Sequence, residues 1–484
     1  MSSVVLSLCL AANAAGEQKP NIVLIFADDL GINDLSCYGR QDQRTPRLDR
    51  MAAEGVRFTC AYCSQPICSP SRAGILTGKN PARLHITTFL PGRPDAPSQR
   101  LLHPQIAMQL PLEEMTLAEY LKEAGYATAC IGKWHLGGAG FGPKEQGFDY
   151  VHAGQANTKP SATEGGKGEY DLTRHAVEFI EQNKNRPFFL YLPHNTPHIP
   201  QAAKPELVEK YKDSFNPVNA ALMETLDDCV GIVLDKLKEL KLDENTIVIF
   251  TSDNGGLHVL EFPGGPSTHN TPYRGGKGFL YEGGLREPAI VRWPGKIKPA
   301  VIDTPTVNLD WAPTLLTLAG LKIPVGIDGQ DISPLLLGGK IDMPPRVFYW
   351  HFPHYNNQGG RPAGAVREGD WKYILSYDTG RVELYNLATD VAEEHDVAVD
   401  NGAVIARLEA LRSDWLKSID GQNNASNPNF DRTLFHKLYE EFDPSRPILR
   451  TTAAGMEEDM KEWRALMNEV VRGNRPAKAK AKQQ

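Results

Sequence analysis

The feature that most constrains the fold of this chain is a series of short, unbroken apolar runs. A run of five or six apolar residues without polar alternation suits a strand that is buried on both faces of a sheet. We expect such strands at 21–26, 127–131, 187–192, 246–250 and 288–293.

Segments with helical periodicity separate these runs. Thr116-Leu-Ala-Glu119 has the spacing of a capping box at a helix start. Other helical repeats lie at 172–182, 218–240 and 309–318. Strands that alternate with helices predict an α/β fold, in which a large, mostly parallel sheet is flanked by helices on both faces.

The pattern changes after residue 345. Short strands at hairpin-like spacing are expected at 346–350, 365–367, 371–375 and 382–385, followed by helices near 401–416 and 456–471. We therefore predict a large domain at 17–345, which carries the candidate catalytic residues. A smaller α+β subdomain with an antiparallel sheet should follow at 346–474. The lysine-rich end at 475–484 is expected to be a flexible basic tail.

The N-terminus has features of a signal peptide. Residues 4–12 are apolar but too few to span a bilayer, and Ala12-Asn13-Ala14 has the A-x-A form of a signal-peptidase site. We predict a signal peptide at 1–15 and export to the periplasm or the extracellular space. A basic segment before the apolar run is missing, which a misplaced start codon would explain. The alternative to a signal peptide is a frayed N-terminus. No later apolar run is long enough to predict a membrane span.

Charge and cysteine content narrow the class further. The 484 residues include 52 Lys and Arg against 59 Asp and Glu, a net charge of −7, which gives no general attraction to nucleic acid or to an anionic membrane. Seven Cys are few for an exported chain, so the fold should not depend on disulfides. For Cys60 and Cys63 we favour buried thiols or one local disulfide over a zinc or redox site.

Polar side chains follow two of the expected strands. Asp28 and Asp29 come after the first apolar run, and Asp253 and Asn254 follow the run at 246–250. The carboxyl ends of parallel strands gather at one edge of a sheet, where ligands bind. Carboxylate and amide oxygens suit Ca²⁺ or Mg²⁺ rather than zinc. The alternative is that these residues simply begin loops.

Cations and imidazoles follow the other strands. Lys133 and His135 would lie on one face of an extended segment. His194 and His198 come after the run at 187–192, and Lys277 lies in a glycine-rich segment. Each of these residues, taken alone, more often has a structural role than a catalytic one. Together with a divalent cation they predict a pocket for an ester of a compact, multivalent oxyanion, with proton transfer by imidazole.

The most specific segment is Cys68-Ser-Pro-Ser-Arg72, followed by Ala73-x-x-x-Thr77-Gly78. It resembles the signature of the sulfatase family, in which a maturation enzyme oxidises this Cys to Cα-formylglycine (3-oxoalanine). The resemblance includes the acidic and lysine motifs above, in the family's order over about 20–300. Residues 371–387 also look like part of the family's C-terminal subdomain.

This resemblance implies an alkaline phosphatase-like fold and a set of site residues. The implied metal ligands, for Ca²⁺ rather than Mg²⁺, are Asp28, Asp29, Asp253, Asn254 and the modified Cys68. The implied catalytic residues are Cys68, Arg72, Lys133, His135, His198 and Lys277. In the family's usual scheme His135 helps to take a proton from the hydrated aldehyde, and His198 protonates the departing alcohol.

The substrate is less constrained. We favour a sulfated polysaccharide or oligosaccharide, with substrate contacts from His194, His351, His354 and Arg361. Aromatic rings at 350–355 suit stacking on a sugar, although they could instead form the interface between the two domains. Arg361 and Arg367 could bind a uronate or a second sulfate. No feature of the sequence indicates an oligomeric state.

Three alternative functions remain open from the sequence. The first is an arylsulfatase acting on small aryl esters. The second is a phosphonate monoester or phosphodiester hydrolase of the same superfamily. The third is a sulfoglycan-binding protein in which Cys68 is never converted.

Overall fold

The computed structural model describes residues 19–154, 161, 163, 165–338 and 345–473. The predicted signal peptide at 1–15 and the predicted basic tail at 475–484 lie outside the described residues. No helix in the described ranges is both long enough and apolar enough to cross a bilayer.

The predicted large sheet has nine strands in the order β10-β2-β8-β7-β1-β6-β4-β5, with β9 paired to β2. Neighbours from β7 to β5 are parallel, and β8 runs antiparallel to both β7 and β2. The strands are β1 (Asn21–Asp28), β2 (Val56–Tyr62), β4 (Ala127–Gly132), β5 (Tyr150–Ala153), β6 (Phe188–Pro197), β7 (Thr246–Ser252), β8 (Arg286–Arg292), β9 (Ala300–Ile302) and β10 (Thr306–Val307).

All five predicted apolar runs are strands of this sheet: β1, β4, β6, β7 and β8. β2 was not predicted, because its residues alternate between buried and half-buried at its start instead of forming an unbroken apolar run. Half-buried strands of this kind carry a period-two pattern.

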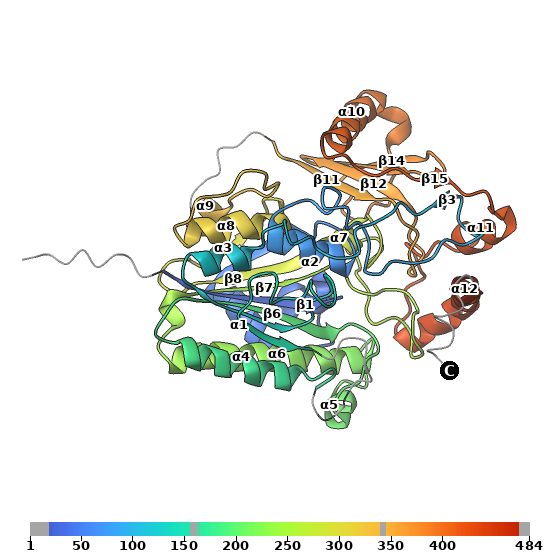
Figure 1. The fold of residues 1–484 in the computed structure, drawn as a ribbon. Coiled ribbons are helices and arrows are strands. Elements are labelled where there is room, and N and C mark those ends of the chain that lie inside the picture. The colour runs from blue at the N-terminus through green and yellow to red at the C-terminus, as the bar shows by residue number, and fades with distance from the viewer. Residues whose placement is uncertain (1–18, 155–160, 162, 164, 339–344, 474–484) are drawn as a thin grey trace, which may run out of the picture.

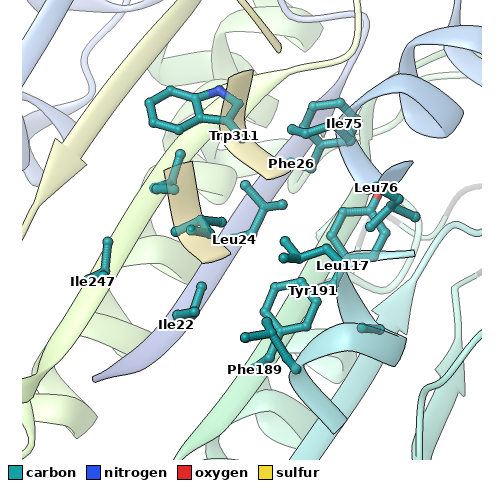
Figure 2. Close-up of a cluster of buried hydrophobic side chains, with 14 of the residues drawn as sticks. Ile22, Leu24, Phe26, Ile75, Leu76, Leu117, Phe189, Tyr191, Ile247 and Trp311 are labelled. Atoms are coloured by element: carbon teal, nitrogen blue, oxygen red, sulfur yellow. The ribbon is translucent and has the colours of Figure 1, made fainter. Parts of the chain in front are cut away.

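Helices cover both faces of the sheet (Figure 1). Along β1, Ile22, Leu24 and Phe26 point to one face and Val23 and Ile25 to the other, as strand geometry requires. Figure 2 shows the first face, where Ile75, Leu117 and Trp311 from three helices close over the strands. The helices on this face are α2 (Cys68–Thr77), α3 (Leu117–Glu123), α8 (Trp311–Leu318) and α9 (Ser333–Leu336). Those on the other are α1 (Pro46–Glu54), α4 (Glu169–Asn183) and α6 (Pro217–Glu239).

The predicted antiparallel sheet is a four-stranded meander of β11 (Val347–Phe352), β12 (Ala363–Glu368), β13 (Trp371–Ser376) and β14 (Val382–Asn386). Leu408 of α10 (Gly402–Ser418) packs on it beside Tyr373 and Leu384. Together these elements form the α+β part that the sequence predicts after residue 345.

The last described elements pack against residues from the first part of the chain. β15 (Ala425–Ser426) pairs with β3 (Leu101–Leu102). α11 (Arg432–Tyr439) and α12 (Ala453–Gly473) share a buried cluster with Leu257 and Leu260. The remaining elements are α5 (Pro205–Lys210), α7 (Glu282–Leu285) and the short 3-10 helices Ile32–Asp34, Ser36–Tyr38, Asp243–Asn245, Asn308–Asp310 and Ala398–Asp400.

A buried ionic network, here called the interface cluster, joins the two sheets. It consists of Glu282, Arg286, Arg367, Lys372 and Glu393. Lys372 Nζ lies 2.8 Å from Glu282 Oε1 and 2.8 Å from Glu393 Oε1, and both acids are fully buried. Burial raises the pKa of Glu393 to about 7 despite Lys372. The pKa of Glu282 falls, because Lys372 and Arg286 outweigh the effect of its burial.

The described cysteines are all free thiols: Cys37, Cys60, Cys63, Cys68, Cys130 and Cys229. Cys37 is half-buried and the others are buried. Cys60 Sγ lies 2.9 Å from Arg367 Nη1, and Cys63 Sγ lies 3.5 Å from the Gly284 carbonyl oxygen. The prediction of buried thiols is confirmed for Cys60 and Cys63, and the alternative of a local disulfide between them is wrong.

Candidate active site

The parallel register of β1 and β7 brings four predicted metal ligands together. Ala27 pairs with Ser252, so the residues that follow each strand leave the sheet at the same level. The Asp29 amide donates to Asp253 Oδ1 (3.0 Å), and Asn254 Nδ2 donates to Asp29 Oδ1 (2.9 Å). The side chains of Asp28, Asp29, Asp253 and Asn254 are all buried.

Cys68 is the first residue of α2 and is buried beside these acids. Its Sγ and one carboxylate oxygen each of Asp28 and Asp253 lie within 4.8 Å of one another. Arg72, one turn further along α2, is fully buried and donates from Nη2 to Asp253 Oδ2 (2.8 Å) and from Nη1 to the Lys133 carbonyl (3.0 Å). The helix therefore delivers a thiol and a guanidinium to one side of the acids.

Two lysines neutralise the acids from other elements. Lys133, just after β4, places Nζ 2.6 Å from Asp28 Oδ2, and Lys277 places Nζ 2.7 Å from Asp29 Oδ2. Burial alone would raise the pKa of Asp28, but Lys133, His198 and Arg72 hold it well below its usual range. The pKa of Asp253 is raised by its burial and by the neighbouring Asp28 carboxylate.

Two buried oxygens of this cluster have no hydrogen-bond partner among the described residues: Asp28 Oδ1 and Asn254 Oδ1. An unpaired buried acceptor costs about 1–3 kcal/mol unless something satisfies it. Three carboxylates and an amide oxygen are donors that a hard divalent cation prefers. The residues present therefore fit a divalent metal ion.

The imidazoles of His198 and His135 have different neighbours around the acids. His198 Nε2 lies 3.8 Å from Asp29 Oδ2, and its pKa falls to about 3 through burial and Lys277. Among the described residues, no acid is hydrogen-bonded to the His135 imidazole. Its Nε2 lies 2.8 Å from the Leu90 carbonyl oxygen, and burial and Lys133 lower its pKa to about 3.

The Lys133–His135 segment lies beyond the end of β4 and is not a regular strand. β4 ends at Gly132, and His135 has φ +58°, so the segment turns instead of continuing as an extended strand. Lys133 nevertheless lies near enough to His135 to help burial lower the pKa of its imidazole. Of the two residues, Lys133 forms an ion pair with one of the acids, whereas His135 is hydrogen-bonded to a backbone carbonyl.

The sequence analysis did not identify Lys167 and Glu169, which contact the segment that carries His198. Lys167 Nζ donates to the Ile199 carbonyl (2.8 Å) and lies 3.4 Å from His198 Nδ1. Burial lowers the pKa of Lys167 to about 8. Glu169 Oε1 accepts from Thr196 Oγ1 (2.7 Å). The signal that could have found them is the glycine cluster Gly165-Gly-Lys-Gly-Glu169.

The four candidate substrate contacts are engaged with other protein groups. His194 Nδ1 hydrogen-bonds Glu169 Oε2, and its side chain is fully buried. His351 contacts the Tyr377 hydroxyl (2.7 Å), His354 the Thr87 hydroxyl (2.7 Å) and Arg361 the Asp378 carboxylate (2.8 Å). Substrate contact by these residues stays a prediction.

Two further residues lie at the boundary between the sheets. Trp350 Nε1 donates to the Cys63 carbonyl (2.9 Å), and its ring packs against Tyr62 at 5.3 Å. The alternative in which these aromatics form the interface is therefore confirmed for Trp350. Arg367 is buried against the Tyr62 hydroxyl, away from any solvent-facing position for a uronate.

A second group of possible metal ligands lies on β5 and α4. His152 Nε2 is 2.7 Å from Asp171 Oδ2, and His175 Nε2 is 3.9 Å from Asp171 Oδ1. Arg174 also pairs with the Asp171 carboxylate. Because a cation already neutralises the only acid of this group, it is a poorer metal site than the acids around Cys68.

Comparisons with known proteins agree with this geometry. The family model Sulfatase matches residues 20–321, and the model for the C-terminal region of N-sulphoglucosamine sulphohydrolase matches residues 275–414. Human Arylsulfatase A is 40% identical over 411 residues, covering 76% of this chain and 77% of the relative. The N-acetylgalactosamine-6-O-sulfatase of Bacteroides thetaiotaomicron is 31% identical, covering 82% of this chain and 93% of the relative.

Solved structures give the same picture. Ps i-CgsB in complex with k-i-k-neocarrahexaose superposes with a TM-score of 0.73 at 30% identity, covering 84% of this chain and 94% of that structure. The phosphonate monoester hydrolase of Agrobacterium radiobacter, at 18% identity and a TM-score of 0.61, shares the fold. The chain belongs to the sulfatase family, with the alkaline phosphatase-like fold, and is a sulfuric ester hydrolase.

Proposed function

We propose that this protein hydrolyses a sulfate monoester of a carbohydrate, using formylglycine made from Cys68 and a bound Ca²⁺ ion. The observation that carries the proposal is the position of Cys68 beside Asp28 and Asp253, close to two buried oxygens that have no hydrogen-bond partner among the described residues. Mg²⁺ is the second choice, because it prefers fewer protein ligands and more water than this set of acids provides.

The cations of the site would stabilise the charge of the reacting sulfate. Cleavage spreads negative charge over the sulfuryl oxygens and the departing oxygen, and fixed positive groups in a buried pocket stabilise such charge strongly. Lys133 and Lys277 are both buried and each is already held by an acid, so neither needs to be ordered during the reaction. Arg72 forms an ion pair with Asp253 and so fixes the position of that carboxylate.

Modified Cys68 would supply a hydrated aldehyde hydroxyl as nucleophile, a role that a thiol fills poorly because its sulfur adduct is harder to release. The ion would polarise the sulfate oxygens. We assign His198 the protonation of the departing alcohol. His135 would take up a proton at Nδ1, a buried nitrogen for which the described residues offer no hydrogen-bond partner.

A carbohydrate is the substrate class we favour. Several similar proteins are named for sulfated sugars, among them an N-acetylgalactosamine-6-O-sulfatase and a structure holding k-i-k-neocarrahexaose. The similarity to Arylsulfatase A leaves small aryl sulfates as the second candidate. Phosphonate monoester or phosphodiester hydrolysis is the third, suggested by a shared fold alone.

Two further elements of the proposal come from the sequence. A formylglycine-generating maturation enzyme must act on Cys68. Export, directed by the predicted signal peptide at 1–15, would place the enzyme where sulfated polysaccharides occur. The oligomeric state is not part of the proposal.

The test is the release of inorganic sulfate from a panel of sulfated mono- and oligosaccharides, with 4-nitrophenyl sulfate and a phosphonate monoester alongside. The enzyme is co-expressed with a formylglycine-generating enzyme. We expect the highest kcat/KM on one sulfated sugar. Preference for 4-nitrophenyl sulfate over every sugar would favour the aryl alternative, and preference for the phosphonate would overturn the proposal.

A further inference from the structure

We propose that Asn270 is a positioning residue that holds the segment carrying Lys277 against the segment carrying Asp253 and Asn254. The inference rests on the proposed function, in which Lys277 stabilises the charge of the reacting sulfate. The side chain of Asn270 is buried, and the hydrogen bonds that its amide makes among the described residues all go to the backbone of these two segments.

The side-chain amide of Asn270 bridges the two segments. Its Oδ1 accepts from the Gly256 amide (3.2 Å), and its Nδ2 donates to the carbonyl oxygens of Gly256 (3.0 Å) and Gly275 (3.0 Å). Gly256 follows Asn254 by two residues, and Gly275 precedes Lys277 by two. These bonds use both donors and the acceptor of the amide, so its orientation is fixed from both sides.

The backbone of Lys277 is bound to the same carbonyl oxygen. The Lys277 amide donates to the Gly256 carbonyl oxygen (3.1 Å), which has two lone pairs and accepts from Asn270 as well. At the end of its side chain, Lys277 places Nζ 2.7 Å from Asp29 Oδ2. Asn270 therefore fixes the oxygen that receives the Lys277 amide, and with it the point from which the lysine side chain extends to the acids.

Three glycines make room for the Asn270 amide and its neighbours. A Cβ on Gly31, two residues after Asp29, would lie 2.4 Å from Asn270 Oδ1. A Cβ on Gly256 would lie 3.0 Å from the same oxygen, and one on Gly276 would lie 2.5 Å from Asn270 Nδ2. None of the three has a positive φ, so close approach rather than backbone conformation accounts for glycine at these positions.

The candidate metal ligands have anchors that do not involve Asn270. The Asp253 amide donates to the Ala27 carbonyl oxygen (3.1 Å), and the Asp29 amide donates to Asp253 Oδ1 (3.0 Å). Loss of the Asn270 amide should therefore displace Lys277 rather than these carboxylates.

A second anchor of the lysine segment leads to another part of the site. The Gly278 amide donates to the carbonyl oxygen of Pro66, two residues before Cys68. This bond holds the lysine segment near the candidate nucleophile, but it does not tie the segment to the acids. Loss of Asn270 should therefore loosen the position of Lys277 without releasing the segment.

The first test is amide hydrogen exchange of the full-length enzyme, which does not depend on activity. Mass spectrometry follows the peptides that cover 274–281. Asn270→Ala should speed exchange of these peptides about tenfold or more, because the bonds that protect the Lys277 amide open more often. Peptides of the antiparallel sheet should keep the wild-type rate. Wild-type exchange at 274–281 in Asn270→Ala would overturn the inference.

Asn427→Ala is the matched control. Asn427 is also buried, and its Nδ2 donates to the carbonyl oxygens of Ala96 (3.0 Å) and Gln99 (2.7 Å), while its Oδ1 accepts from the Asn429 amide (3.0 Å). The same set of bonds is lost there, between segments that carry none of the candidate catalytic residues. Exchange at 274–281 should stay at the wild-type rate in this variant.

A double-mutant cycle tests whether Asn270 acts through Lys277. Asn270→Ala should lower kcat/KM on the best sulfate ester of the panel about tenfold, because a displaced ammonium stabilises the transition state less well. In the Lys277→Met background the same substitution should lower kcat/KM less than about twofold. A merely structural residue would lower it equally in both backgrounds, and that result would overturn the inference. Asn427→Ala should change kcat/KM less than about twofold in either background.

The outcomes separate this inference from the proposed function. If Lys277→Met leaves kcat/KM unchanged, the role that the proposed function gives to Lys277 is wrong, and hydrogen exchange still decides whether Asn270 holds the segment. If Lys277→Met lowers kcat/KM and Asn270→Ala does not, the positioning role of Asn270 is wrong. Should Asn270→Ala fail to fold, Asn270→Ser replaces it in both tests with the same expectations, because the serine hydroxyl is too short to reach both segments.

Discussion

The acids around Cys68 and the interface cluster around Lys372 are both buried groups of opposite charges, but they differ in how completely their charges are paired. In the interface cluster a single ammonium lies 2.8 Å from both of its acids. In the active site, lysines and an arginine contact the acids. Asn254 Oδ1 and Asp28 Oδ1, which lies 3.7 Å from Arg72 Nη2, still have no hydrogen-bond partner among the described residues. Glu393 Oε1 also makes no hydrogen bond among the described residues, but it lies 2.8 Å from Lys372 Nζ. The interface cluster therefore pairs its charges within the protein, whereas the two active-site oxygens would gain a close partner from a bound cation.

This difference separates a structural role from a catalytic one. Removing a charge from a fully paired buried cluster leaves its partner uncompensated, which costs stability. Removing a group from a cluster arranged around a ligand costs activity first. The two clusters should therefore respond in opposite ways to equivalent substitutions.

The largest expected effect is on activity. Cys68→Ala should lower turnover by about 10⁴-fold or more, because it removes the proposed nucleophile. The thermal midpoint should stay nearly unchanged, since alanine differs from the modified side chain by little more than the aldehyde oxygen. Sulfate release and thermal unfolding measure the two quantities. Cys63→Ala is the matched control, a buried thiol expected to retain turnover. Retained turnover in Cys68→Ala would exclude it as nucleophile.

The opposite response is expected in the interface cluster. Lys372→Met should lower the free energy of unfolding by about 3–5 kcal/mol, because Glu282 and Glu393 lose their shared cation. Activity per folded molecule should remain. Urea unfolding and sulfate release below the unfolding midpoint test both statements. A loss of stability below about 1 kcal/mol would show that this pairing contributes little.

Removal of calcium should affect activity and stability together. A ligand that binds only the folded state at 100 times its Kd adds about 2.7 kcal/mol, and chelation removes this contribution. The thermal midpoint and sulfate release should both fall with chelator and recover with added Ca²⁺. The chelator should lower the thermal midpoint of Lys372→Met by the same amount as that of the wild type. An enzyme indifferent to exhaustive chelation would contradict the proposed ion.

The smallest expected effect is a pH dependence from the interface cluster. Burial raises the pKa of Glu393 from 4.5 to about 7. Between these values the unfolded chain loses the proton and the folded protein keeps it, so this contribution to stability falls as pH rises through that window. In Glu393→Gln the free energy of unfolding should therefore decline by roughly 2–3 kcal/mol less than in the wild type between pH 4.5 and pH 7. Urea unfolding as a function of pH measures it, and identical declines would contradict the assignment.

Much of the site could be predicted from the sequence because its residues lie at the ends of parallel strands. Unbroken apolar runs identify β1 and β7, and the parallel register of these strands necessarily brings Asp28 and Asp253 together. The capping box at Thr116 is likewise confirmed, with reciprocal hydrogen bonds to Glu119. Such features are local or follow directly from sheet geometry.

The missed features depend on backbone turns and on distant contacts. The left-handed conformation of His135 is not visible in its residue type, because positive φ is usually signalled by glycine or asparagine. Lys167 reaches His198 from 31 residues away in the chain, through a glycine-rich segment whose path no periodicity records. Contacts of single side chains with residues distant in the chain could therefore not be predicted from the sequence.

The most direct test of the account combines two readings on one sample. The Cys68 peptide should be lighter by about 18 Da, the change from Cys to formylglycine, and the same sample should release inorganic sulfate from a sulfated saccharide in the presence of Ca²⁺. Sulfate release that scales with the converted fraction is the predicted result. Full conversion with every sulfate ester left intact, or equal turnover by unconverted enzyme, would contradict it.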